Sequence, residues 1–213
     1  MNAIVKRSGE VPRYTPGQRA NHWLLVVLFI LMAASGLAFF HPAFWFLGNL
    51  LGGGPWARIL HPFLGVVMFV AFFWLASHFW GENRIETYDR AWRQRLGDVI
   101  NNRDHNLPEI GKYNYGQKLL FWTLVVTLLL LIVSGILMWR PYFAEYFPIT
   151  LVRIAAVVHA FSAFVLILAV IVHLYSALWV KGSIRAMTRG SVSHAWAKHH
   201  HPLWYRKVTG TKG

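Results

Sequence analysis

The chain has 213 residues, of which 56% are hydrophobic and 14% charged, and its formal net charge is +13. This apolar content is typical of an integral membrane protein rather than a soluble domain. Because the chain has no cysteine, disulfides, cysteine-ligated iron–sulfur clusters and haem attached through C-x-x-C-H are excluded.

Four charge-poor stretches are each long enough to cross a bilayer as a helix. They cover residues 22–40, 62–80, 119–139 and 154–180. The sequence therefore predicts an all-α integral membrane protein, a four-transmembrane-helix bundle within a single membrane domain of residues 1–213. The first residues lack a short apolar region with a cleavage site, so we expect no removable signal peptide.

Positive charge is distributed unevenly along the chain. Eighteen of the 21 Lys and Arg residues lie in the N-terminal arm 1–21, the middle loop 81–118 and the C-terminal tail 181–213. The positive-inside rule places these segments, and so both termini, in the cytoplasm. Basic residues there favour anionic membrane lipid, so the net charge does not indicate nucleic-acid binding.

The N-terminal arm is expected to be extended, with Asn21 capping the first helix. His22 follows at the cytoplasmic end of that helix. Fourteen residues later, Ser35-Gly36 lies on a similar face, about 21 Å further out. The glycine would let a flat, bulky group approach the backbone, or would serve ordinary close packing between helices.

In the second span, His61 precedes Pro62, which is expected in the first turn of the helix. His61 would then lie at the outer end of the span, with Gly65 leaving room beside it. His78 is turned roughly 100° from His61 and is interpreted as interfacial. His41 is likewise off the face of His22.

The middle loop is expected to carry a short surface helix within residues 87–102, and it ends in GKYNYGQK. There Asn114, Gly116, Gln117 and Lys118 offer hydrogen-bond donors at the membrane boundary. Spacing alone favours a loop with a helix cap. The third span contains no histidine and is assigned a packing role.

The fourth span contains His159 and His173, fourteen residues apart. On a helix, this spacing brings the second ring to within roughly 40° of the face of the first. The two rings would then lie about 21 Å apart along the helix axis. Polar side chains at membrane depth are costly and usually mark a functional site. A neutral imidazole is also the commonest metal ligand.

Matched depth yields two pairs of histidines. His22 with His173 forms the inner pair, and His61 with His159 forms the outer pair. Two axial imidazoles on each of two haems would leave no open position for a ligand, which suits electron transfer. Zinc is disfavoured because its ligands must converge. A metal site at His199–His201 has little support.

Several stretches resemble the gamma subunit, a cytochrome b, of respiratory formate dehydrogenase. These are HWLLVVLFILMAASGLAFFHP, ARILHPFLGVVMF, GKYNYGQK, SGILMWRPYFAEYFP, HLYSALWVKGSI and WAKHHHPLWYRKV. The resemblance covers almost the whole chain and implies a dihaem cytochrome b in the bacterial inner membrane. It implies outer-haem ligands His61 and His159 and inner-haem ligands His22 and His173.

The resemblance also implies a quinone site beside the inner haem, formed by Asn114, Gly116 and Gln117 together with His173. Electrons would arrive from an iron–sulfur (beta) subunit and a molybdenum or tungsten catalytic (alpha) subunit, and would reduce menaquinone or ubiquinone. No formate chemistry is expected on this chain. Heterotrimers could associate into a higher oligomer. We also expect Arg58 or Arg153 to pair with haem propionates.

Three other functions are compatible with a four-span chain, of which a purely structural membrane anchor is disfavoured because an anchor needs no polar side chains at membrane depth. The cytochrome b subunit of a nickel–iron hydrogenase or thiosulfate reductase would share the dihaem arrangement but bind a different partner. A small proton-coupled transporter would need a substrate cavity and usually an intramembrane carboxylate, and the four spans contain none.

Overall fold

A computed structural model of the chain describes residues 9–101, 103, 106–140 and 142–211. Most of these residues are helical, and four helices are long and apolar enough to cross a membrane. The long helices are α2 (Pro16–Phe40), α3 (Gly54–Phe79), α6 (Tyr115–Met138) and α7 (Ile149–Trp179). This confirms the prediction of an all-α membrane protein with four spanning helices.

The helix α2 begins with a capping box, six residues before the apolar stretch. The backbone N–H of Gln18 donates to Thr15 Oγ1 at 3.3 Å, and that of Thr15 donates to Gln18 Oε1 at 3.0 Å. Pro16 occupies the first helical position, where a missing N–H leaves no hydrogen bond unmade. The prediction that Asn21 caps the helix is therefore wrong, and its side-chain amide donates to the carbonyl of Ala71 at 2.7 Å.

The helix α3 also begins earlier than the apolar stretch does. A 3-10 helix, η1 (Pro42–Leu51), and a left-handed turn at Gly52 lead into it. Pro62 consequently lies inside the helix, and the prediction that it occupies the first turn is wrong. Because Pro62 has no N–H, it cannot donate to the carbonyl of Arg58 four residues earlier.

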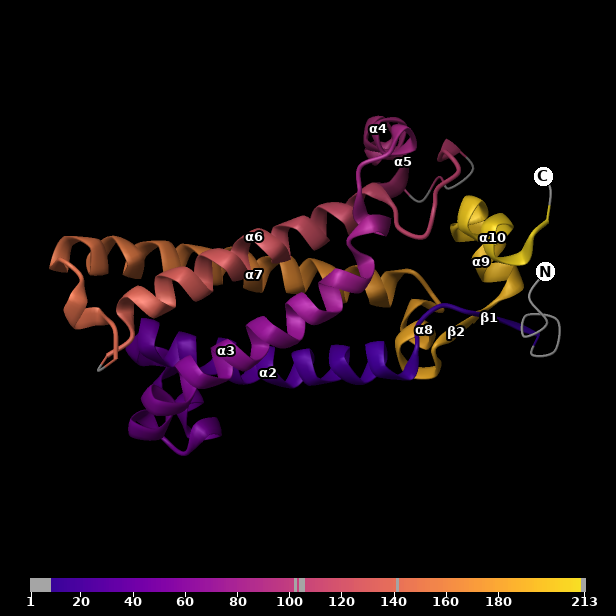
Figure 1. The fold of residues 1–213 in the computed structure, drawn as a ribbon. Coiled ribbons are helices and arrows are strands. Elements are labelled where there is room, and N and C mark those ends of the chain that lie inside the picture. The colour runs from indigo at the N-terminus through magenta and orange to yellow at the C-terminus, as the bar shows by residue number, and fades with distance from the viewer. Residues whose placement is uncertain (1–8, 102, 104–105, 141, 212–213) are drawn as a thin grey trace. The chain divides into compact units, whose positions relative to one another are not determined.

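The chain forms two compact units, each assembled from separate parts of the sequence. The first, here called the bundle, comprises residues 20–77 and 123–174. It contains most of the four long helices, which run alongside one another in Figure 1, and the 3-10 helix η4 (Ala144–Tyr146). The assignment of the whole chain to a single domain stays a prediction.

The second, here called the terminal unit, comprises residues 1–19, 78–122 and 175–213. Its elements are β1 (Glu10–Pro12), η2 (Gly81–Asn83), α4 (Thr87–Gln94), α5 (Leu96–Ile100), α8 (Ser183–Arg189), β2 (Ser191–Ser193), α9 (His194–His200) and α10 (Pro202–Thr209). The strands pair antiparallel, with Val11 opposite Val192 and both side chains buried. The N-terminal arm is thus extended where it forms β1. The predicted surface helix is present as α4 and α5.

Candidate functional site

Two pairs of histidines meet in the bundle, each between helices that are far apart in the sequence. His22 of α2 lies against His173 of α7, with ring centroids 6.4 Å apart. His61 of α3 lies against His159 of α7 at 6.3 Å. The structure thus brings together the two pairs that were matched by depth, and their role as haem ligands stays a prediction.

The ring separations fit two imidazoles that face each other across one metal ion. With metal–nitrogen bonds of about 2.0–2.1 Å and each nitrogen roughly 1.1 Å from its ring centre, facing rings would lie about 6.3 Å apart. Among the described residues, no group of three or more His, Cys, Asp or Glu could hold a metal ion. Each site therefore offers two histidine ligands. This suits a metal whose remaining ligands come from a macrocycle better than it suits zinc.

Two buried serines contact the outer pair. Ser35 Oγ of α2 lies 2.7 Å from His61 Nδ1, and Ser134 Oγ of α6 lies 3.0 Å from His159 Nδ1. Both serines are buried: the exposed fraction is 0% for Ser35 and 3% for Ser134. The interpretation of the third span as a packing helix was thus incomplete, because α6 supplies a partner for a candidate ligand.

The number of hydrogens on each hydroxyl shows which group donates and which accepts in these contacts. A hydroxyl has one hydrogen, and each serine has the carbonyl four residues earlier within reach, Leu31 at 2.7 Å from Ser35 and Leu130 at 2.6 Å from Ser134. Each hydroxyl therefore donates to its carbonyl and can accept from an imidazole that is protonated at Nδ1. The backbone carbonyl of Leu131 is a second hydrogen-bond acceptor for His159. A neutral ring protonated at Nδ1 keeps its lone pair on Nε2, the nitrogen that can then bind a metal.

A glycine follows each serine and faces the same histidine. A Cβ on Gly36 would lie 3.8 Å from His61 Cε1, and a Cβ on Gly135 would lie 3.4 Å from His159 Cε1. Gly65, expected beside His61, instead faces Met32, whose Cε would be 3.3 Å from an added Cβ. Only the Ser-Gly dipeptide of the first span was predicted to matter, although the repetition of this dipeptide near the C-terminal ends of two spans was a readable signal.

The inner pair has a different environment. In the part of the chain that the structure describes, His22 Nδ1 is buried and has no hydrogen-bond partner. The ring of His22 packs edge-on against Trp23, with centroids 5.6 Å apart. His22 therefore lacks at Nδ1 the hydroxyl contact that both outer histidines have.

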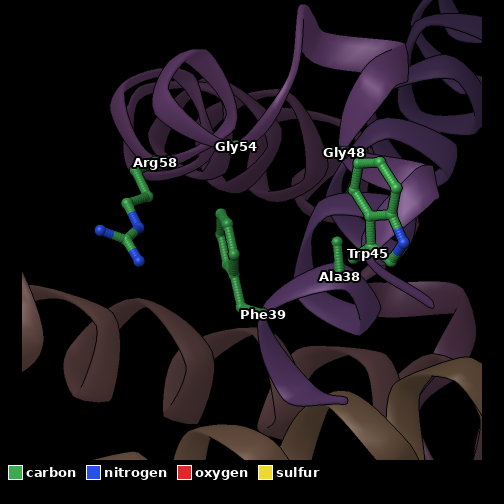
Figure 2. Close-up of a pocket in the computed structure, with 6 residues that line it drawn as sticks. All are labelled: Ala38, Phe39, Trp45, Gly48, Gly54 and Arg58. Atoms are coloured by element: carbon green, nitrogen blue, oxygen red, sulfur yellow. The ribbon is translucent and has the colours of Figure 1, made fainter. Parts of the chain in front are cut away.

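A cavity of about 470 Å³ shares a wall with the outer pair. It is lined by Ala38, Phe39, Trp45, Gly48, Gly54 and Arg58. The ring of Phe39 lies 5.5 Å from that of His61. Figure 2 shows Phe39 and the guanidinium of Arg58 beside this cavity. Among the described residues that line the cavity, Arg58 is the only charged one, so the cavity suits an anionic group.

Asn114 and Gln117 cap the N-terminus of α6. The backbone N–H of Asn114 donates to Gln117 Oε1, and that of Gln117 donates to Asn114 Oδ1, both at 2.9 Å. This is the helix cap that spacing alone favoured. The cap uses the oxygen of each side-chain amide, so the NH₂ groups remain as donors. Gly116 and Gln117 are exposed.

Lys118, the next residue, is buried in the terminal unit. Its ammonium lies 2.7 Å from Asp89 Oδ2, 2.8 Å from the carbonyl oxygen of Arg84 and 3.0 Å from the hydroxyl of Tyr88. Neither side chain of the Lys118–Asp89 pair is exposed. These contacts use all three donors of the ammonium, so the expectation that Lys118 offers a donor to a ligand is wrong.

His201, the last residue of the His199–His201 run, is buried with 3% of its surface exposed. Its Nδ1 lies 2.9 Å from the carbonyl oxygen of Gly111, and Arg13 donates to the carbonyl of Lys112 at 2.6 Å. Burial, and then the positive charge of Arg13, lower the pKa of His201 to about 3, so the ring is neutral. The N-terminal arm and the C-terminal tail thereby hold two consecutive carbonyls just before the α6 cap.

Residues 13–190 match the family described as Prokaryotic cytochrome b561. The chain is 46% identical to the formate dehydrogenase cytochrome b556(fdo) subunit of Escherichia coli K12, over 97% of both chains. It is 44% identical to the formate dehydrogenase cytochrome b556 subunit of Haemophilus influenzae, over 98% of this chain and 87% of that one.

A third relative, the nitrate-inducible formate dehydrogenase cytochrome b556(Fdn) subunit of Escherichia coli K12, is 43% identical over 89% of this chain and 88% of its own. The four apolar helices and this kinship make the chain a multi-pass protein of the bacterial inner membrane. Cytochromes b carry haem b, and the paired imidazoles fit it. The chain belongs to the prokaryotic cytochrome b561 family, in the group that contains the cytochrome b556 subunits of formate dehydrogenase.

Proposed function

We propose that the chain is the membrane subunit of a formate dehydrogenase and takes electrons from the outer side of the membrane to a quinone on the cytoplasmic side. The observation that carries this proposal is the pairing of four histidines, at 6.3 and 6.4 Å, on helices long enough to span a membrane. The names of the relatives favour this function over the hydrogenase and transporter alternatives.

Two haems b are proposed, one for each pair. His61 and His159 would hold the outer haem, and His22 and His173 the inner haem. A haem with two axial imidazoles supplies one-electron transfer and has no open position for a ligand. The fourteen residues between His159 and His173 correspond to about 21 Å along α7, which supports two separate sites rather than one.

Asn114, Gly116 and Gln117 are proposed to bind the quinone, menaquinone or ubiquinone. A quinone carbonyl accepts hydrogen bonds, and the capping geometry leaves the two side-chain NH₂ groups to donate them. The exposure of Gly116 and Gln117 supports access for such a ligand. Reduction to quinol takes two electrons and two protons, and the protons would come from the cytoplasm.

Arg58 is proposed to pair with a propionate of the outer haem. The support is its place in the lining of the cavity, together with Phe39, whose ring lies 5.5 Å from that of His61. Arg153, the other basic residue expected in this role, lies in the first turns of α7. Both arginines are exposed, and of the two only Arg58 lines the cavity. The cavity therefore favours Arg58 over Arg153.

The proposed complex contains an iron–sulfur (beta) subunit and, through it, a molybdenum or tungsten catalytic (alpha) subunit. Both termini of this chain would lie in the cytoplasm, in contact with membrane lipid at the basic segments. Heterotrimers of this kind could form a higher oligomer. Formate chemistry would take place on the catalytic subunit.

Optical spectra test the two-haem proposal. Reduced-minus-oxidised spectra and pyridine haemochrome quantitation should give two haems b in the parent, with a different one lost in His159→Ala and in His173→Ala. The control is His41→Ala, because His41 caps η1 by accepting from Ala43 N at 3.1 Å, and it should keep both haems. A parent with one haem or none, or loss of the same haem in both variants, would contradict the proposal.

A further inference from the structure

We propose that Ser35 and Ser134 lower the reduction potential of the outer haem and so favour electron flow from the outer to the inner site. This inference rests on the proposed function, because it takes the outer and inner pairs to hold one haem each. It concerns two residues of this chain that reach the metal only through its histidines, so they are positioning residues.

The effect follows from the direction of the hydrogen bonds. When protonated at Nδ1, each outer histidine donates that N–H to a serine oxygen whose own hydrogen is donated to a backbone carbonyl. A hydroxyl that donates in this way is a stronger acceptor, since successive hydrogen bonds polarise one another. An imidazole that donates from Nδ1 is a more basic ligand at Nε2. A more basic ligand stabilises ferric over ferrous iron, which lowers the reduction potential.

Burial strengthens this effect. Ser35 and Ser134 have 0% and 3% of their surface exposed, so water does not compete for the hydrogen bonds, and electrostatic interactions are stronger at low dielectric. The hydrogen bond to a serine also occurs twice, because each of the two proposed axial histidines of the outer site contacts one. The two serines come from different helices, α2 and α6.

His22, one of the two histidines of the inner site, gives the contrast with the outer site. His22 Nδ1 is buried and has no partner among the described residues, so His22 does not gain basicity in this way. With other influences equal, the outer haem has the lower potential of the two. Electrons that enter at the outer side then move to the site of higher potential, which is the inner one.

The experiment is a redox titration, followed optically and by electron paramagnetic resonance, of the complex purified with its haems. Ser35→Ala and Ser134→Ala should each raise the midpoint potential of the outer haem and leave that of the inner haem unchanged. The double variant should show the larger rise. The low-spin ferric signal of the outer haem should shift in the same variants.

A matched control is present in α6. Thr127 is 5% exposed, and its hydroxyl bonds the carbonyl of Thr123 at 2.7 Å, as the serine hydroxyls bond their own helices. Thr127→Val removes such a hydroxyl from the same helix and should shift neither potential. Ser35→Thr and Ser134→Thr keep a hydroxyl that can bond the same carbonyls and should restore the parental potential.

The outcomes separate this inference from the function on which it rests. A parent complex with fewer than two haems contradicts the proposed function. Two haems whose potentials do not move in the alanine variants, or move equally, overturn the serine inference alone. If an alanine variant loses the outer haem, the threonine variant decides: recovery of that haem at the parental potential supports the inference, and failure to recover it counts against it.

Discussion

The bundle and the terminal unit bury polar groups in different ways. In the described part of the bundle, the buried polar side chains are hydroxyls. Those of Ser35, Thr127 and Ser134 bond to their own helices, and that of Ser162 has no hydrogen-bond partner. In the terminal unit, they include charged groups such as Lys118 and Asp89, which join segments far apart in the sequence. Polar groups in the bundle can thus orient a ligand, whereas those in the terminal unit hold the chain together.

The difference has a physical cause. A spanning helix satisfies its backbone internally, and a charge at membrane depth is costly, so the buried polar groups of these helices are small hydroxyls rather than charges. The elements of the terminal unit are short, from three to eight residues apart from the ends of the long helices. Helices of that length are not stable alone, so contacts between distant segments are needed to order them.

The largest effect on stability is expected at the Lys118–Asp89 pair. Lys118→Met would leave the Asp89 carboxylate buried and unpaired, which should lower the free energy of unfolding by about 3–5 kcal/mol. The control is Arg95→Met, since Arg95 is 56% exposed in its pair with Asp98, and it should cost less than about 1 kcal/mol. Thermal unfolding in detergent measures both. Equal destabilisation would show that buried charges do not hold the terminal unit together.

A smaller effect is expected at His201. His201→Phe removes the partner of the Gly111 carbonyl, and an unsatisfied buried acceptor should cost about 1–3 kcal/mol. His199→Ala is the comparison within the same run, because the side chain of His199 is exposed and its loss should change the thermal midpoint less. If His199→Ala had the larger effect, the assignment of the anchoring role to His201 would be wrong.

The same residue predicts a pH dependence. The pKa of His201 is about 3 in the folded chain and ordinarily near 6.5, so protonation favours the unfolded state. Its contribution to stability is complete above about pH 6.5 and is lost as the pH falls toward about 3. His201→Gln keeps a donor for Gly111 but does not titrate. Its thermal midpoint should therefore fall less than the parent's between about pH 7 and about pH 4, and parallel curves would contradict this.

The smallest effects on stability are expected at the glycines beside the outer histidines. Alanine stabilises a helix interior by roughly 0.5–1 kcal/mol relative to glycine, and the space at Gly36 and Gly135 accepts a Cβ. If a flat group packs against them, Gly36→Ala and Gly135→Ala should lower the content of the outer haem without lowering the thermal midpoint of the haem-free chain. Gly65→Ala, which faces Met32, should leave haem content unchanged. Retention of full haem content in all three variants would favour ordinary helix packing.

Much of the bundle could be predicted because its signals are local. Uncharged stretches indicate spans, and the spacing of His159 and His173 places both rings on one face of α7. The start of α2 was also readable, since Thr15, Pro16 and Gln18 form a recognisable cap, but the predicted span began only at the edge of the apolar stretch. Polar residues can continue helical hydrogen bonding beyond the hydrocarbon region, so apolar length underestimates helix length.

The sequence by itself determined the number of spans, the distribution of charge around them and which histidines share a depth, because each depends on residues close together in the chain. The tertiary structure decided which side chain contacts the Nδ1 of His61 and of His159. It also showed that His201 and Lys118 are buried. A hydroxyl such as that of Ser134 has no periodic signal, and its partner lies 25 residues away on another helix. Such contacts depend on how helices pack, which is a property of the whole fold rather than of any one segment.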